Sequence, residues 1–425
     1  MLASVSFRRV LPAVLMVFGN RALAQGLPVA RPEDVGLSSA ALDRIPYALQ
    51  RYIDSSKMAG AVVAVARHGK LAYVRAVGLM DVDSAKPMRT DAIFRIMSMT
   101  KPLVSVGAMR LVERGQLSLD EPVTKYIPAF SSTKVYASGS VAEPAFKQPD
   151  RVMTVRDLLR HTSGLTYGFF SSTIADSIIR RAAPFNATLT LAQGIDSLAR
   201  VPLAFSPGTG FGYGYSTDAL ARVVETVSGK SLDRFLDDEV LRPLRMMETA
   251  HHARPEWLPR IPRLYSVTPA GLRTGPNLLS AMYLPEGKHL SGGGNMLSTV
   301  SDYLRFAQMM LNGGELDGVR VLKRKTVALM TRNQLPASLT PIQNPLLFVS
   351  PGYGFGLGFA VLVDSAASGL PGNPGMYRWW GINNTYFWVD PKADLIGMVL
   401  TQLSPGRPVA LEQEFQRLVY SAIQK

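Results

Sequence analysis

A serine and a lysine three residues apart, Ser98 and Lys101, stand at the start of an apolar run in the segment RIMSMTKPLVSVGAMRLVERG. The run predicts a helix over 98–114 that ends at Gly115, with both side chains on one face, about one turn apart. Serine is a weak nucleophile unless a base removes its proton. Lysine is such a base only when its amine is neutral, which burial and a helix N-terminus both favour. The pair therefore indicates a nucleophile, Ser98, and its base, Lys101.

The Ser-x-x-Lys spacing is weak evidence on its own. A second copy, Ser131 and Lys134, lies in an aperiodic stretch with no helix start to favour a neutral lysine. Structural interpretations also exist, in which Ser98 caps a helix and Lys101 extends its stem to the surface. On spacing alone the structural interpretation is the more frequent one, so other residues must decide.

The elements that would position this pair are predicted from hydrophobic periodicity. Expected helices span 38–53, 98–114, 154–164, 188–200, 216–228, 230–262 (giving way to a Pro-rich part), 299–312, 323–332 and 409–423. Expected strands are a hairpin over 60–78 with a His-Gly-Lys turn, then 354–363, 376–380 with 384–390, and 394–402; residues 131–150 are expected to be a loop. The strands near the two ends of the chain must pair with one another to form one sheet. This predicts an α+β fold with an antiparallel sheet and a mostly helical insertion at roughly 120–285.

Composition narrows the class of protein. The chain has 425 residues, 47% hydrophobic and 18% charged, as in ordinary globular proteins. Its net charge of +14 comes from scattered Lys and Arg without a basic run, so no nucleic-acid partner is expected. The absence of cysteine excludes disulfides and thiol nucleophiles, and no His-Glu-x-x-His occurs. We therefore expect no metal and no cofactor.

The first 24 residues have the pattern of a secretory signal peptide. Arg8 and Arg9 precede the apolar run VLPAVLMVF, and Ala22-Leu23-Ala24 fits a cleavage site. The run is too short to span a bilayer, which takes about 20 residues, so stable membrane insertion is not expected. We expect a periplasmic or secreted bacterial protein with one domain over 25–425. The sequence does not determine its oligomeric state.

Two later segments contain further candidates. PGTGFGYGYSTDALARVVETVSG (207–229) places Tyr213 just before a helix, where a tyrosine can relay a proton or hold a lysine neutral. Taken alone, Tyr213 and Tyr215 are more often packing residues. The segment YRWWGINNTYFWVDPKADLIGMVLTQ contains Trp379 and Trp380, by default also packing residues, and Gly381, which permits close backbone approach.

Several stretches together resemble the serine β-lactamase and penicillin-binding-protein superfamily, and most closely the family VIII carboxylesterases. They are FRIMSMTKPLVSVGAMRLVERGQLSLDEPVTKYIP, VRDLLRHTSGL, PGTGFGYGYSTDALARVVETVSG, LSGGGNMLSTVSDYLRFAQMMLNGG and FWVDPKADLIGMVLTQ. The resemblance covers most of the chain after residue 30. It implies a β-lactamase-like fold and a catalytic set of Ser98, Lys101 and Tyr213.

The resemblance also implies a third motif at Trp379-Trp380-Gly381, on a strand beside the nucleophile. The backbone N–H groups of Ser98 and Ile382 would then form an oxyanion hole. Tyr215, Trp379, Trp380 and Gly381 would bind substrate. His161 falls on a family segment that is structural, and SGGGNM (291–296) is interpreted as a sharp turn packed near the site.

Two departures from the family pattern bear on the substrate. β-Lactamases usually carry Tyr-x-Asn and Lys-Thr-Gly, whereas here Tyr213 is followed by Gly214 and Tyr215, and no Lys-Thr-Gly occurs. An apolar strand suits an uncharged acyl group, so the expected activity is hydrolysis of small carboxylic esters, with short acyl chains favoured, through an acyl-enzyme. The alternatives are a β-lactamase, a D-amino-acid peptidase or amidase, and a penicillin-binding-like protein that is acylated without turnover. No Gly-x-Ser-x-Gly supports an α/β-hydrolase.

Overall fold

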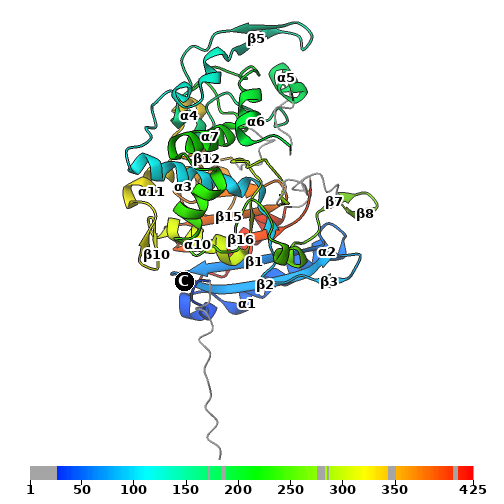
Figure 1. Ribbon diagram of the computed structural model, residues 1–425. Coiled ribbons are helices and arrows are strands. Elements are labelled where there is room, and N and C mark those ends of the chain that lie inside the picture. The colour runs from blue at the N-terminus through cyan, green and yellow to red at the C-terminus, as the bar shows by residue number, and fades with distance from the viewer. Residues whose placement is uncertain are drawn as a thin grey trace, which may run out of the picture.

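A computed structural model describes residues 26–170, 173–182, 188–274, 283–284, 287–342, 351–404 and 410–424. The predicted signal peptide, residues 1–24, lies outside these ranges. Strands from both ends of the chain form one antiparallel sheet in the order β12-β13-β14-β15-β16-β1-β2-β3 (Figure 1). Their bounds are β12 (Tyr353–Phe355), β13 (Ala360–Leu362), β14 (Tyr377–Gly381), β15 (Thr385–Asp390), β16 (Leu395–Thr401), β1 (Gly60–Arg67), β2 (Lys70–Asp81) and β3 (Lys86–Pro87).

The junction between the two chain ends is the β1–β16 pair. Its sequences, GAVVAVAR and LIGMVLT, are apolar on both faces, and Val63 pairs with Val399 in the middle of the register. Both faces need cover, because a strand without a polar face cannot be exposed to water. Helices α2 (Arg44–Asp54) and α13 (Leu411–Ser421) pack against each other and the sheet, and α10 (Val300–Leu311) contacts β1, β15 and β16 (Figure 1). The predicted α+β fold with an antiparallel sheet is confirmed.

The helical part lies above the sheet in Figure 1 and surrounds α3 (Thr100–Glu113). Helix α3 is buried along most of its length, and a Cβ at Gly107 would lie 3.0 Å from Leu236, so it needs a small residue there. The helices and helical turns of this part are α4 (Val155–Leu159), α5 (Ile174–Ala182), α6 (Leu191–Leu198), α7 (Ser216–Ser228), α8 (Leu232–Leu236), η5 (Asp237–Leu241) and α11 (Arg324–Met330). Helix α3 packs on α7, which ends at the left-handed Gly229 as expected.

Several predicted element boundaries are wrong. The expected loop over 131–150 contains a hairpin, β5 (Val135–Gly139) and β6 (Pro144–Lys147), which projects at the top of Figure 1. Most of its residues are exposed, so it has no buried face to leave an alternating pattern. The run 354–363 is two strands, because the chain reverses between β12 and β13.

Two further boundaries differ in the N-terminal and middle regions. The helix expected over 38–53 is divided at Asp43 into α1 (Ser39–Leu42) and α2. Residues after 241 do not continue as the expected helix, and the part up to 274 contains a small hairpin, β7 (Tyr265–Thr268) and β8 (Gly271–Thr274). Proline-rich sequence cannot sustain helical hydrogen bonds, which explains the early end.

Candidate active site

Ser98 lies in a single helical turn, η2 (Met97–Met99), between the short strand β4 (Phe94–Arg95) and α3. Strand β4 pairs with β9 (Leu297–Ser298), and the Ile96 N–H donates to the Met296 carbonyl at 3.0 Å. Met97, directly before Ser98, has a left-handed backbone with φ 48°. Such a conformation costs free energy in a non-glycine residue, so the surrounding contacts must hold it in place. The serine is thus presented on a constrained turn at the start of a buried helix.

Lys101 occupies the first turn of α3, and only 1% of its surface is exposed. Its Nζ lies 3.2 Å from Ser98 Oγ, 2.9 Å from the Tyr167 hydroxyl and 2.6 Å from the Gly293 carbonyl oxygen. Burial lowers the pKa of Lys101 to about 7, against the smaller opposing effect of the Asp218 carboxylate. The surface interpretation of Lys101 is wrong, and the amine is placed where a base for Ser98 is needed.

These three contacts match the hydrogen-bonding capacity of a neutral amine. A neutral amine has two N–H groups and one lone pair, whereas an ammonium has three donors and no acceptor. The Gly293 carbonyl can only accept, so it takes one N–H. If Tyr167 accepts the other, the lone pair faces Ser98, whose hydroxyl then donates to Nζ. This pattern is the one required for proton removal from Ser98.

The glycine-rich turn at 291–295 supplies the Gly293 carbonyl and is itself anchored by Asp218 on α7. Asp218 accepts from Ser291 Oγ at 2.5 Å and from the Gly293 N–H at 3.0 Å. A Cβ on residue 293 would lie 2.5 Å from an Asp218 oxygen and 2.6 Å from the Tyr167 hydroxyl, so only glycine fits. The interpretation of SGGGNM as a turn packed near the site is confirmed.

Tyr213 is also part of this cluster and is buried. Lys101 Nζ lies 4.6 Å from the centre of its ring. Its hydroxyl has no hydrogen-bond partner of good geometry among the described residues. Burial raises the pKa of Tyr213 well above its usual value, and the nearby Ser98 and Trp379 moderate the rise. A buried hydroxyl left unpaired beside a nucleophile is available to a reacting group.

Tyr167 was not singled out from the sequence, although only Thr166 separates it from the HTSGL segment. Its hydroxyl contacts Lys101, and burial raises its pKa well above the usual value, so it stays protonated. His161, in that same segment, is buried with its ring 4.9 Å from the Tyr213 ring. Burial lowers the pKa of His161 well below its usual value. A neutral His161 supports Tyr213 by packing, in agreement with the structural interpretation.

The two tyrosines are expected to differ in their effects on turnover. If Tyr213 relays a proton, as the sequence predicts, Tyr213→Phe should lower kcat/KM for a p-nitrophenyl ester by about 10²-fold or more. Tyr167→Phe removes a neutral hydrogen bond to Lys101 and should cost only about 2- to 10-fold. Tyr167→Phe should also move the midpoint of the pH–rate profile to lower pH, because the lost bond favours the ammonium form. Equal losses in both variants, with an unmoved midpoint, would contradict these assignments.

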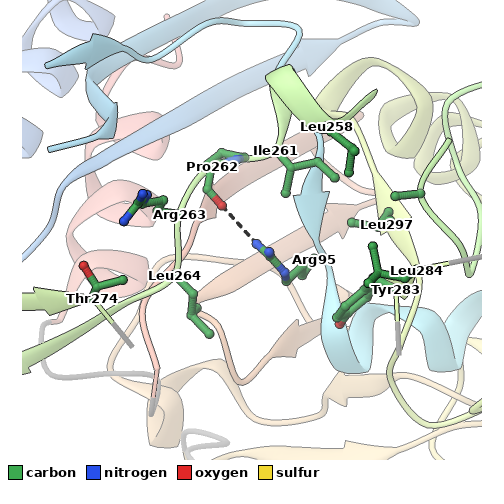
Figure 2. Close-up of a pocket in the computed structure, with 11 residues that line it drawn as sticks. Arg95, Leu258, Ile261, Pro262, Arg263, Leu264, Thr274, Tyr283, Leu284 and Leu297 are labelled. Atoms are coloured by element: carbon green, nitrogen blue, oxygen red, sulfur yellow. Dashed lines mark hydrogen bonds between the residues drawn. The ribbon is translucent and has the colours of Figure 1, made fainter. Parts of the chain in front are cut away.

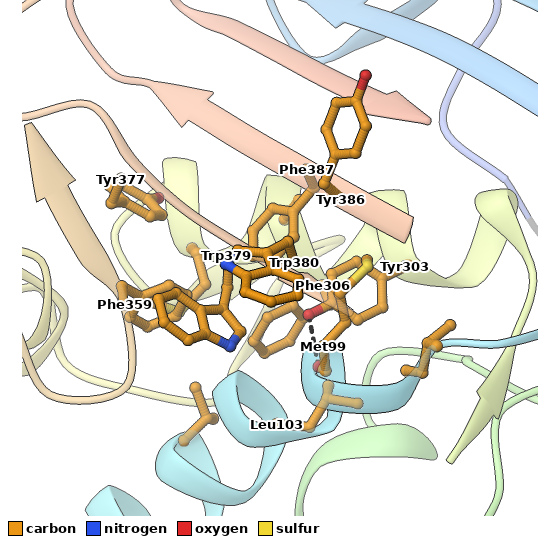
Figure 3. Close-up of a cluster of buried hydrophobic side chains, with 14 of the residues drawn as sticks. Met99, Leu103, Tyr303, Phe306, Phe359, Tyr377, Trp379, Trp380, Tyr386 and Phe387 are labelled. Atoms are coloured by element: carbon orange, nitrogen blue, oxygen red, sulfur yellow. Dashed lines mark hydrogen bonds between the residues drawn. The ribbon is translucent and has the colours of Figure 1, made fainter. Parts of the chain in front are cut away.

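The predicted third motif lies on β14, next to the Ser98 turn. The ring centres of Trp379 and Tyr213 are 5.2 Å apart, and those of Trp380 and Phe170 are 6.3 Å apart. Figure 3 shows both indoles packed among buried side chains that include Met99 and Leu103 of the Ser98–α3 segment. Both tryptophans therefore border the site, and Trp379 is the one against Tyr213.

Gly381 and Ile382 complete this edge. A Cβ on residue 381 would lie 2.3 Å from the Ile96 carbonyl and 3.0 Å from Met97 Cβ, so the strand approaches the nucleophile turn only because this residue is glycine. Ile382 follows in the turn that the Asn384 N–H closes on the Gly381 carbonyl. Among the described residues the Ile382 N–H has no acceptor, as an oxyanion-hole donor requires.

Tyr215 belongs to an aromatic wall that extends outward from Lys101. Its ring centre lies 4.6 Å from that of Tyr167, and burial raises the pKa of Tyr215 to about 12. Phe169 stacks on Tyr167 at 5.3 Å and is 52% exposed, and Phe170 packs against Tyr213. The approach to Ser98 is thus lined by aromatic rings.

The second Ser-x-x-Lys pair lies elsewhere. Ser131 falls in the 3-10 turn η4 (Pro128–Ser132) and, like Lys134, is exposed. In the described ranges no three His, Asp or Glu side chains gather closely enough to hold a metal ion. No helix in those ranges combines the length and hydrophobicity needed to cross a membrane.

Comparison with known proteins gives independent evidence for the family and the fold of this chain. The family model for Beta-lactamase matches residues 47–421. Esterase EstB of Burkholderia gladioli is 31% identical over 392 residues, which cover 88% of this chain and 93% of EstB. The structure of EstCE1, a hydrolase with promiscuous acyltransferase activity, has a TM-score of 0.78 at 27% identity over 90% of this chain and 98% of its own. Simvastatin synthase LovD from Aspergillus terreus has a TM-score of 0.77 at 25% identity, covering 90% and 98%.

Proposed function

Because the chain belongs to the β-lactamase family of serine hydrolases, we propose that it hydrolyses small carboxylic esters through an acyl-enzyme formed on Ser98. The observation that carries this proposal is the buried Lys101 amine, 3.2 Å from Ser98 Oγ and with a pKa near 7. A base with such a pKa is half neutral at physiological pH and can accept the serine proton. We also propose that residues 1–24 direct export to the periplasm or beyond.

The proposed reaction has two halves. Ser98 Oγ attacks the ester carbonyl while its proton passes to Lys101 Nζ, and the N–H groups of Ser98 and Ile382 stabilise the oxyanion. The bond to the alcohol breaks as the proton passes from Lys101, assisted by Tyr213, to the leaving alkoxide. Water then attacks the acyl-enzyme and gives its proton to the same amine. Departure of Ser98 Oγ, which takes that proton back, releases the acid.

The surroundings of Ser98 favour esters over β-lactams. In the motif that usually carries a lysine for the carboxylate of the drug, Trp379 and Trp380 are buried against other aromatic rings. Tyr215 stands in place of the usual asparagine. Each missing polar contact to a β-lactam is worth roughly 1.5–3 kcal/mol in the transition state. Alkoxides also leave more readily than amines, so esters need fewer such contacts.

We expect p-nitrophenyl acetate or butyrate to be hydrolysed at least about a hundredfold more efficiently, in kcat/KM, than nitrocefin or penicillin G, which corresponds to about 2.7 kcal/mol. The measurement compares all four on one preparation, with Ser98→Ala as the blank. Equal or greater efficiency on a β-lactam would move the protein to the amide-hydrolysing alternatives. A burst of p-nitrophenol without steady turnover would instead indicate a protein that is acylated and not released.

A further inference from the structure

A cavity lies between β4, β9 and the segment 258–264, next to the residues that lead into the Ser98 turn (Figure 2). Its volume is about 470 Å³, within the range of roughly 300–1,000 Å³ typical of small-molecule sites. Most of its lining is apolar, contributed by Leu258, Ile261, Leu284 and Leu297 among others. None of the described lining residues is acidic. The cavity is therefore suited to an apolar ligand. The polar residues of its lining determine which charge on that ligand would be favoured.

Arg95 is the polar residue that distinguishes this cavity. Figure 2 shows its guanidinium between the Ile261–Leu264 segment and Tyr283, where Nη1 donates to the Pro262 carbonyl at 2.9 Å. The same nitrogen lies 3.3 Å from Gln402 Oε1. These neutral acceptors occupy only part of the five-donor fork of a guanidinium. Burial lowers the pKa of Arg95 from its usual value.

The neighbouring arginines behave differently. Arg263, on the cavity wall, pairs with Asp81 at 3.2 Å and with Asp83 at 3.1 Å. Arg260, three residues before Arg263, pairs with Glu248. Arg95 forms no ion pair with any carboxylate in the described part of the chain. A largely buried cation without an anion is costly, and a bound carboxylate would offset that cost with bidentate, charge-assisted hydrogen bonds.

We propose that this cavity binds an organic monocarboxylate with an apolar body. Arg95 would bind the acid group, and the leucine and isoleucine side chains would contact the apolar body of the ligand. The site is separate from the acyl-enzyme position. It does communicate with the nucleophile, because Tyr283 lines the cavity and its hydroxyl donates to Met97 Sδ at 3.1 Å. Met97 is the strained residue directly before Ser98. An occupant that shifts Tyr283 therefore acts on the turn that presents the nucleophile.

The test uses full-length protein carrying Ser98→Ala, so that no turnover contributes, with sodium octanoate and octanol as probes in isothermal titration calorimetry. Octanoate should bind at least about tenfold more tightly than octanol, because only the acid engages the guanidinium. Arg95→Gln should remove that difference. Wild-type protein phosphonylated at Ser98 by an alkylphosphonate should still bind octanoate, since the two positions are separate.

A second pair of variants guards against misfolding of Arg95→Gln. Leu258 lies at the rim and is 52% exposed, so either charge is tolerated there. Leu258→Glu should weaken octanoate binding severalfold, whereas Leu258→Lys should maintain or strengthen it. Equal affinity for octanoate and octanol, or identical octanoate affinity in the two Leu258 variants, would overturn the proposal. Complete loss of octanoate binding after phosphonylation of Ser98 would place the acid in the catalytic site and overturn it as well.

Discussion

Replacing Ser98 by alanine is expected to lower kcat/KM for p-nitrophenyl butyrate by about 10⁴-fold or more. Among the described residues, Ser98 supplies the only serine or threonine hydroxyl that is hydrogen-bonded to Lys101 Nζ. An alkylphosphonate probe should label the wild-type protein at Ser98 and fail to label the variant. The fold should be unaffected, since the substitution removes only a hydroxyl from the turn that precedes α3. Mass spectrometry of the labelled peptide measures the site directly.

The chain offers a matched control for this experiment. Ser131 has the same Ser-x-x-Lys spacing but lies exposed in the turn η4, and its partner Lys134 is exposed as well. Ser131→Ala should therefore retain full activity and full labelling. A phosphonate adduct mapped to Ser131 or Ser163 would show that the nucleophile has been assigned to the wrong residue.

Replacing Lys101 by arginine is expected to lower kcat/KM by about 10²–10⁴-fold, the usual contribution of a general base, because a guanidinium cannot accept a proton. In the wild-type protein kcat/KM should rise with pH through a midpoint near 7, where the Lys101 amine loses its proton. Lys134→Arg is the matched control and should be fully active. A midpoint near 10, or near-full activity in Lys101→Arg, would remove Lys101 from the mechanism.

The same pKa also affects stability. In the unfolded chain Lys101 titrates near 10.5, whereas in the folded protein it titrates at about 7. Between these values the unfolded state holds one more proton, so the free energy of unfolding rises with pH by about 1.4 kcal/mol per unit. Below about pH 7 both states are protonated and this dependence ends. The difference in unfolding free energy between wild type and Lys101→Met, measured by urea titration at several pH values, should show this slope.

Much of the sheet could be predicted from the sequence. The β1 and β16 sequences are apolar up to their last residues, Arg67 and Thr401, as expected of strands buried on both faces. The two strands lie in the N-terminal and C-terminal parts of the chain. The helix start at Ser98 and Lys101 could also be predicted, because the apolar run that follows it is stable only when it is buried in the protein interior. The exposed hairpin β5–β6 could not, because a segment without a buried face leaves no periodic signal.

Only the tertiary structure decided the environment of the Lys101 amine. Ser98 is a neighbour in sequence, and its contact follows from helical spacing. Tyr167 and Gly293 are 66 and 192 residues away, and their contacts depend on how α3 packs against distant loops. Local periodicity records which face of an element is buried, but not which distant residue meets it. Arg95 illustrates the same limit, since a buried guanidinium without a carboxylate in the described chain is a property of the folded surroundings and leaves no trace in the local sequence.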